Sequence, residues 1–125
     1  MNSDHEKLTN KEFAGKLETR TKQFAVNVIQ LSNKLTSSPA GKVICYQSIK
    51  SATSIGANYR EANRTVSKAD FRNKISICTK EAAETQYWLE LIMETNIAND
   101  DKVIKLHKEC SELLALFTSI HQGCK

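Results

Sequence analysis

Residues 68–96, KADFRNKISICTKEAAETQYWLELIMETN, decide the fold, because a line of mostly apolar residues recurs along them at steps of three and four. The line consists of Phe71, Ile75, Cys78, Ala82, Thr85, Leu89, Ile92 and Asn96. Such spacing places its members on one side of an α-helix, whereas a strand would alternate at every second residue. Ser67 and Asp70 resemble a capping box with Asp in place of Glu. The segment therefore predicts a long helix that begins near residue 68 and buries one side.

Three further segments carry apolar lines of the same kind. The lines are Phe13, Leu17, Phe24, Val28, Leu31 and Leu35; Ile44, Ser48, Ala52, Ile55, Tyr59, Ala62 and Val66; and Val103, Leu106, Cys110, Leu113, Phe117, Ile120 and Cys124. The gap in the first line falls at Arg20 or Thr21. Polar and turn-forming residues separate the segments at 36–41, where serines suit a cap and Pro39 a first helical turn, and again at 96–101. The sequence predicts helices at about 8–36, 40–66, 68–96 and 101–122.

These helices are expected to form one all-α domain, residues 1–125, folded as an antiparallel up-and-down four-helix bundle. Apolar lines of similar length joined by short connections favour that arrangement. The composition, 40% hydrophobic and 26% charged, is that of an ordinary globular chain. No apolar run is long enough to span a membrane, and the polar start lacks the profile of a signal peptide. We therefore expect a cytoplasmic protein without membrane contact.

Residues suited to catalysis or metal binding are scattered along the chain. No two cysteines are spaced as neighbouring metal ligands, and Cys78, Cys110 and Cys124 occupy positions in the apolar lines. They are interpreted as reduced, with Cys124 near an end that can fray. There is no Glu-x-x-His pair for a metal site and no glycine-rich phosphate loop, and Gly56 indicates close helix packing instead. The sequence predicts no enzyme, metal or cofactor.

The whole chain has a net charge of +4, and its basic residues concentrate in the first half. Between residues 20 and 66 a single acid, Glu61, stands against Arg20, Lys22, Lys34, Lys42, Lys50, Arg60 and Arg64. At about 100° per residue, four of them fall within an arc of about 80°, away from the apolar line of the second helix. These four are Lys42, Lys50, Arg60 and Arg64. Such a stripe can follow a phosphate backbone, and a merely solvated face has the same pattern.

Some apolar residues lie outside the four lines. They are Trp88 and Leu91 in the third predicted helix and Leu114 and Leu116 in the fourth. A second apolar stripe requires a second partner, which is either a wide core face within one protomer or a subunit interface. Glu81 and Glu84 share a helical line with Trp88 and Leu91, so these carboxylates are expected to border such an interface and to pair with basic residues there.

Two segments resemble a known family. They are SATSIGANYREA at 51–62, and KADFRNKI together with KEAAETQYWLELI inside 68–92. Here the chain is similar to bacterial four-helix-bundle proteins encoded within intervening sequences of 23S ribosomal RNA genes. These proteins also look like the accessory variability determinant of diversity-generating retroelements. The outer helices agree in pattern more than in residues.

The resemblance implies a ring or barrel of five four-helix protomers and no catalytic residues. It also implies a basic surface, which in the retroelement relatives serves nucleic acid and a reverse transcriptase. A basic binding role carries over to Lys50, Arg60 and Arg64, which lie within or beside the matching segments. Lys42 rests on geometry alone.

Two hypotheses about function follow. The first is a non-enzymatic homo-oligomer that binds RNA or DNA through a basic surface on the first two helices. The candidate binding residues are Lys50, Arg60, Arg64, Lys42, Arg20 and Lys22, and the candidate interface residues are Trp88, Leu91, Glu81 and Glu84. The second is a protein-interaction scaffold, for a reverse transcriptase or another protein, in which the basic stripe meets an acidic partner and nucleic acid has no direct role.

Overall fold

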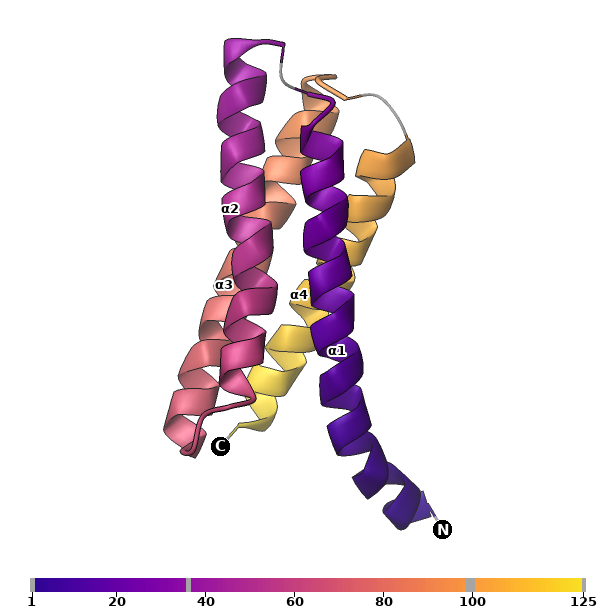
Figure 1. Ribbon diagram of the computed structural model, residues 1–125, viewed down its shortest axis with the longest axis vertical. Coiled ribbons are helices and arrows are strands. Elements are labelled where there is room, and N and C mark those ends of the chain that lie inside the picture. Colours follow the sequence, from indigo (N-terminus) through magenta and orange to yellow (C-terminus); the bar gives the residue numbers. More distant parts are fainter. Residues whose placement is uncertain (1, 36, 99–100, 125) are drawn as a thin grey trace.

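The computed structural model describes residues 2–35, 37–98 and 101–124, with side chains from residue 10 onward, and these residues form four helices and no strand. The helices are α1 (Asn2–Ser32), α2 (Pro39–Ala62), α3 (Lys68–Glu94) and α4 (Asp101–Gly123). The end of α1 and the start of α2 lie at the same end of the molecule as the end of α3 and the start of α4 (Figure 1). The expected all-α architecture is confirmed. None of the described helices is both long and apolar enough to cross a lipid bilayer.

Helices α2 and α3 form the most extensive contact, followed by α3 with α4, whereas α1 touches α4 only sparsely. A hydrogen bond of 2.7 Å joins the hydroxyls of Ser51 and Thr85 inside the α2–α3 contact. The ammonium group of Lys74, near the start of α3, forms an ion pair at 2.7 Å with the carboxylate of Glu61, near the end of α2. Residues that rise in number along α2 therefore face residues that fall in number along α3.

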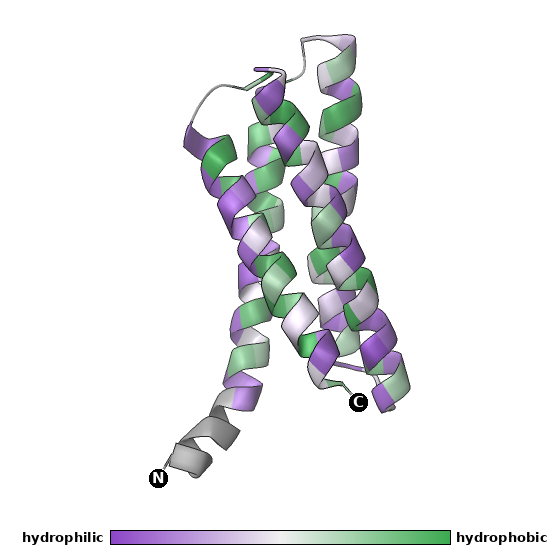
Figure 2. Cartoon of the chain, turned by 180° about the vertical axis from the view of Figure 1, so that it is seen from behind, coloured by the Kyte–Doolittle hydropathy of each residue, from purple (hydrophilic) through white to green (hydrophobic). Residues whose placement is uncertain are grey.

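The core lies where the apolar lines of the four helices meet. The third line is confirmed in its middle, where Ile75, Cys78, Ala82, Thr85, Leu89 and Ile92 are all buried. In the gap of the first line the structure buries Thr21, whose hydroxyl donates to the Leu17 carbonyl at 2.9 Å. Apolar and polar residues alternate around each helix (Figure 2), as expected when one side of the helix faces a shared core.

Both predicted helix starts that depend on serine caps are confirmed. The Ser38 hydroxyl accepts a hydrogen bond from the Gly41 amide at 3.0 Å, with Pro39 as the first residue of α2. The Ser67 hydroxyl accepts from the Asp70 amide at 3.0 Å, and α3 begins at the next residue. Each cap satisfies one of the amides that a helix start leaves without an internal partner.

The predicted end of α2 at residue 66 was wrong, because the helix ends at Ala62. The hydroxyl of Thr65 donates to the Ala62 carbonyl at 2.7 Å, and the guanidinium of Arg64 donates to the Arg60 carbonyl at 2.8 Å. These side chains satisfy carbonyls that a longer helix would have bonded internally, which stabilises the turn. Val66, assigned to the apolar line, is 100% exposed in this turn.

Two other predicted boundaries also differ. Helix α1 extends from Asn2 to Ser32 rather than from about 8 to 36. Its early residue Phe13, assigned to the core, is 44% exposed, and the N-terminal part of α1 diverges from the other helices (Figure 1). Helix α3 ends at Glu94 rather than near 96, because Asn96 adopts a left-handed backbone with φ of 57°. Asn tolerates that conformation better than most residues do.

The close packing expected at Gly56 is confirmed. A Cβ at this position would lie 3.2 Å from Thr21 Oγ1 and 3.4 Å from Thr21 Cβ, so α1 approaches the α2 backbone directly. At Gly15 a Cβ would meet nothing within 4 Å. Gly56 and Gly15 thus differ in their surroundings, because Gly56 lies at a helix contact and Gly15 in open space.

We expect Gly56→Val to lower the free energy of unfolding by about 2 kcal/mol, because its added methyl groups would push α1 away from α2. Gly15→Ala should raise it by roughly 0.5–1 kcal/mol, because Ala favours the helix and no neighbour obstructs its methyl group. Urea unfolding followed by circular dichroism measures both. Equal effects at the two sites would contradict the close contact between α1 and α2.

Candidate nucleic-acid interface

Lys42 and Lys50 lie on the side of α2 that faces solvent. Both are exposed, whereas Ser48 and Ala52, on the opposite side of the same helix, are buried against the core. Neither lysine forms an ion pair with a carboxylate in the described part of the chain. Their positive charges are therefore presented to solvent by a helix whose other side is fixed.

Arg60 and Arg64 converge on one carboxylate of α1. Each guanidinium lies 3.8 Å from an oxygen of Glu18, and both arginines remain largely exposed. Arg64 follows the end of α2, so it belongs to the turn rather than to the helical stripe projected from the sequence. One carboxylate shared by two guanidinium groups leaves one net positive charge at this end of the stripe.

A hollow between α1 and α2 connects Lys22 to this group. It has a volume of about 370 Å³ and is lined by Glu18, Thr21, Lys22, Ala25, Thr53, Gly56, Ala57, Arg60 and Glu61. Small residues such as Ala25 and Ala57 leave the space open between the helices. The structure thus brings Lys22 and Arg60 to the walls of one hollow, although they are far apart in the sequence.

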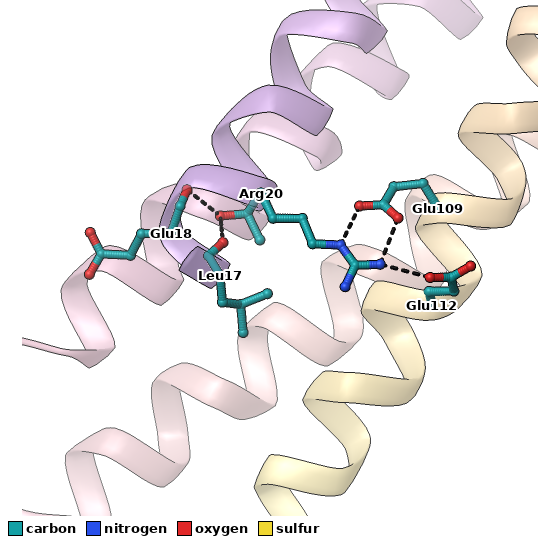
Figure 3. Close-up of polar contacts among 6 residues, drawn as sticks. Leu17, Glu18, Arg20, Glu109 and Glu112 are labelled. Atoms are coloured by element: carbon teal, nitrogen blue, oxygen red, sulfur yellow. Dashed lines mark hydrogen bonds and ion pairs between the residues drawn. The ribbon is translucent and has the colours of Figure 1, made fainter. Parts of the chain in front are cut away.

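Arg20 points away from the stripe and toward α4 (Figure 3). Its guanidinium donates to the two carboxylate oxygens of Glu109 at 2.6 and 2.7 Å and to Glu112 at 2.8 Å. The hydrogen bond with Glu109 is the largest of the causes that raise the pKa of the Arg20 guanidinium. This two-pronged geometry is the strong form of an arginine pair, and it links α1 to α4 where these helices otherwise touch little. The carboxylates of Glu109 and Glu112 therefore offset the positive charge of Arg20, which the sequence predicts to be part of the binding surface.

The second apolar stripe lies on the flank of α3. Trp88 and Leu91 are half-buried, and Trp88 Nε1 is covered without a hydrogen-bond partner among the described residues. Burial raises the pKa of the Glu81 carboxyl and Glu84 raises it further, whereas Lys80 and Lys50 lower it. The structure is compatible with both a broad core face and a subunit interface, so the interface stays a prediction.

The structure adds two residues that the sequence interpretation left out. Tyr46 and Val43 are 64% and 59% exposed on the solvent-facing side of α2, beside the two lysines. The signal was present in the sequence, since Tyr46 follows Lys42 by four residues and precedes Lys50 by four, which aligns all three on one helical face.

The cysteines are free thiols. Cys45, Cys78 and Cys110 are buried, so the structure places Cys45 in the core and leaves Cys124, expected in an apolar line, partly exposed. Burial raises the pKa of both Cys78 and Cys110 to about 12, which keeps these thiols protonated at neutral pH. Among the described residues no group of three or more His, Cys, Asp or Glu side chains is placed to hold a metal ion.

Four long helices around one apolar core, with a basic outer surface on α2, define a helical-bundle protein. Its chain matches the family model described as 23S rRNA-intervening sequence protein over residues 9–119, and the protein belongs to this family. The chain is also similar to a protein of unknown function from the S23 ribosomal protein family of Bacteroides thetaiotaomicron VPI-5482, known from a crystal structure. Identity is 38% and the TM-score 0.77, covering 83% of this chain and 96% of that one. No curated protein is similar enough to count as a match.

We expect Arg20 and Glu109 to stabilise the fold cooperatively. In a double-mutant cycle of Arg20→Gln and Glu109→Gln, urea unfolding should give a coupling energy of about 1 kcal/mol, at the upper end for exposed pairs because the geometry is two-pronged. The cycle for Arg60 and Glu18, whose atoms are 3.8 Å apart, should give less than about 0.5 kcal/mol. A coupling near zero for the first pair would show that it does not stabilise the contact between α1 and α4.

Proposed function

We propose that this protein is a non-enzymatic helical bundle of the cytoplasm that binds RNA or DNA through a basic face on α1 and α2. The basic face consists of Lys22, Lys42, Lys50, Arg60 and Arg64. The observation that carries the proposal is the exposure of Lys42 and Lys50 on the outer side of α2. Neither lysine forms an ion pair with a carboxylate of the described residues, although Lys50 is near enough to Glu81 to lower the pKa of that carboxyl. Arg20 is excluded from the face because it is held by Glu109 and Glu112.

Binding by such a face depends on electrostatics. Each phosphate that a lysine or arginine neutralises releases condensed counterions, so affinity falls steeply as salt rises. The backbone of a straight α-helix rises about 1.5 Å per residue, so the backbone positions of Lys42 and Lys50 are about 12 Å apart along the axis of α2. That separation suits contact with phosphates along a strand and does not by itself require recognition of a base.

The main alternative is a scaffold for another protein, such as a reverse transcriptase, in which the basic face meets acidic residues of the partner. The exposed Val43 and Tyr46 would also suit a protein contact. Purification from native cells with and without nuclease distinguishes the two, because a partner protein retained after nuclease treatment favours the scaffold.

We expect Lys42→Gln together with Lys50→Gln to weaken binding of a fluorescein-labelled oligonucleotide at least tenfold at low salt. The slope of the logarithm of affinity against the logarithm of salt concentration should also become shallower, by the amount that corresponds to the loss of about one to two phosphate contacts. Fluorescence anisotropy measures both quantities. The matched control is Lys105→Gln with Lys108→Gln, which changes the net charge equally at exposed positions of α4. Equal losses in both variants would contradict a localised face, and no binding by the natural protein would refute the proposal.

We further propose that antiparallel up-and-down bundles of this chain assemble into a homo-oligomer, a ring of five by family resemblance. The half-buried flank of α3 with Trp88, Leu91, Glu81 and Glu84 supports this proposal. A second apolar surface on an amphipathic helix is commonly covered by another subunit.

Light scattering at micromolar concentration should give a mass several times the 14.0 kDa of one chain. Leu91→Lys should reduce that mass toward one chain while the helical circular dichroism spectrum is retained, because a charge on the α3 flank opposes burial against a second copy. Lys108→Gln, a change at an exposed site of α4, serves as the control. A mass near 14.0 kDa for the natural protein would refute assembly.

A further inference from the structure

Tyr46 occupies an unusual place for an aromatic residue of this protein. Its side chain is 64% exposed, whereas Phe24, Tyr59 and Phe117 are buried in the core. Tyr59 and Phe117 pack edge-on with centroids 5.3 Å apart, and Tyr87 packs against Trp88. In the described part of the chain the ring of Tyr46 takes part in no such aromatic pair. Its faces are accessible to a ligand.

The neighbours of Tyr46 on α2 are cationic. Lys42 lies one turn before it and Lys50 about one turn after it, each about 6 Å away along the helix axis. Val43, also exposed, widens the apolar patch beside the ring. A flat apolar ring between two ammonium groups matches a ligand that carries a flat ring between two anionic groups.

We propose that Tyr46 stacks on an unpaired base while Lys42 and Lys50 bind the phosphates on either side. The inference rests on the proposed nucleic-acid-binding function and makes the ligand of the basic face single-stranded RNA or DNA. In a duplex the bases are stacked on one another, and a tyrosine on the convex surface of a helix cannot reach their faces. Stacking on an aromatic ring tolerates every base, so we expect little sequence preference.

The positive charge of this surface favours a nucleic acid over a second copy of the chain packed symmetrically on the same surface. Such a contact would bring the lysines of two protomers together, and like charges oppose it. A contrasting site exists on α3, where Tyr87 is 54% exposed between Glu84, three residues before it, and Glu90, three residues after it. Carboxylates in that arrangement repel phosphates, so Tyr87 is the matched control for loss of an exposed tyrosine.

The test is fluorescence anisotropy with two labelled probes, an oligouridine of about fifteen nucleotides and a blunt-ended RNA duplex of about fifteen base pairs, which has no unpaired base. Tyr46→Ala should weaken binding of oligouridine about tenfold, a typical loss for one stacked base, with little change for the duplex. Tyr46→Phe should bind as the natural protein does, because stacking needs only the ring. Tyr87→Ala should also leave both affinities unchanged.

Each contrary outcome identifies which claim fails. If the natural protein binds oligouridine in a salt-dependent manner and Tyr46→Ala binds equally well, stacking is refuted while the basic face stands. If the variant weakens binding of the duplex as much as binding of oligouridine, the assignment to single strands is wrong. If the mass of Tyr46→Ala by light scattering drops below that of the natural protein, Tyr46 is a subunit contact and the stacking proposal fails. No binding of either probe by the natural protein refutes both proposals.

Discussion

The contact between α2 and α3 is the constraint on which the rest of the structure depends. The side of α2 that faces α3 carries small or short residues, among them Ser48, Ser51 and Ala52, and all three are buried. The hydroxyl of Thr85 lies within hydrogen-bonding distance of Ser51 Oγ and of the Glu81 carbonyl, whereas the buried Ser48 Oγ has no hydrogen-bond partner among the described residues. Small side chains let two backbones approach closely, and the hydrogen bond between Ser51 and Thr85 offsets the cost of burying these two hydroxyls.

The placement of charge follows from that contact. Because one side of α2 is fixed in the core, the residues opposite must face solvent, and these include Lys42, Tyr46 and Lys50. Helix α1 then packs against α2 at Gly56, and the hollow along this contact has both Lys22 and Arg60 in its walls. The basic face is therefore assembled by packing. Arg20, on the same helix as Lys22, turns instead toward acids of α4 and strengthens the sparsest helix contact.

The sequence predicts the helices well and the surface only in part. Periodicity located the buried line of α3, and serine caps located the starts of α2 and α3, because both signals are local. It could not show that Val66 leaves the helix, since the turn depends on hydrogen bonds made by Arg64 and Thr65. Nor could it show the partner of Arg20, because Glu109 is 89 residues away along the chain. Tyr46 differs from these, because its spacing of four residues from Lys42 and from Lys50 already places it on their side of α2, although the pattern of charges alone does not include it.

The central claim is that nucleic acid lies on the outer side of α2. Ultraviolet cross-linking of the natural protein to an oligouridine that contains 4-thiouridine, followed by trypsin digestion and mass spectrometry, tests it most directly. Cleavage after Lys42 and Lys50 releases residues 43–50, VICYQSIK, which contain Tyr46. The account predicts that this peptide carries the nucleotide adduct and that unlabelled oligouridine competes it away. Adducts confined to peptides of α3 or α4 would contradict it.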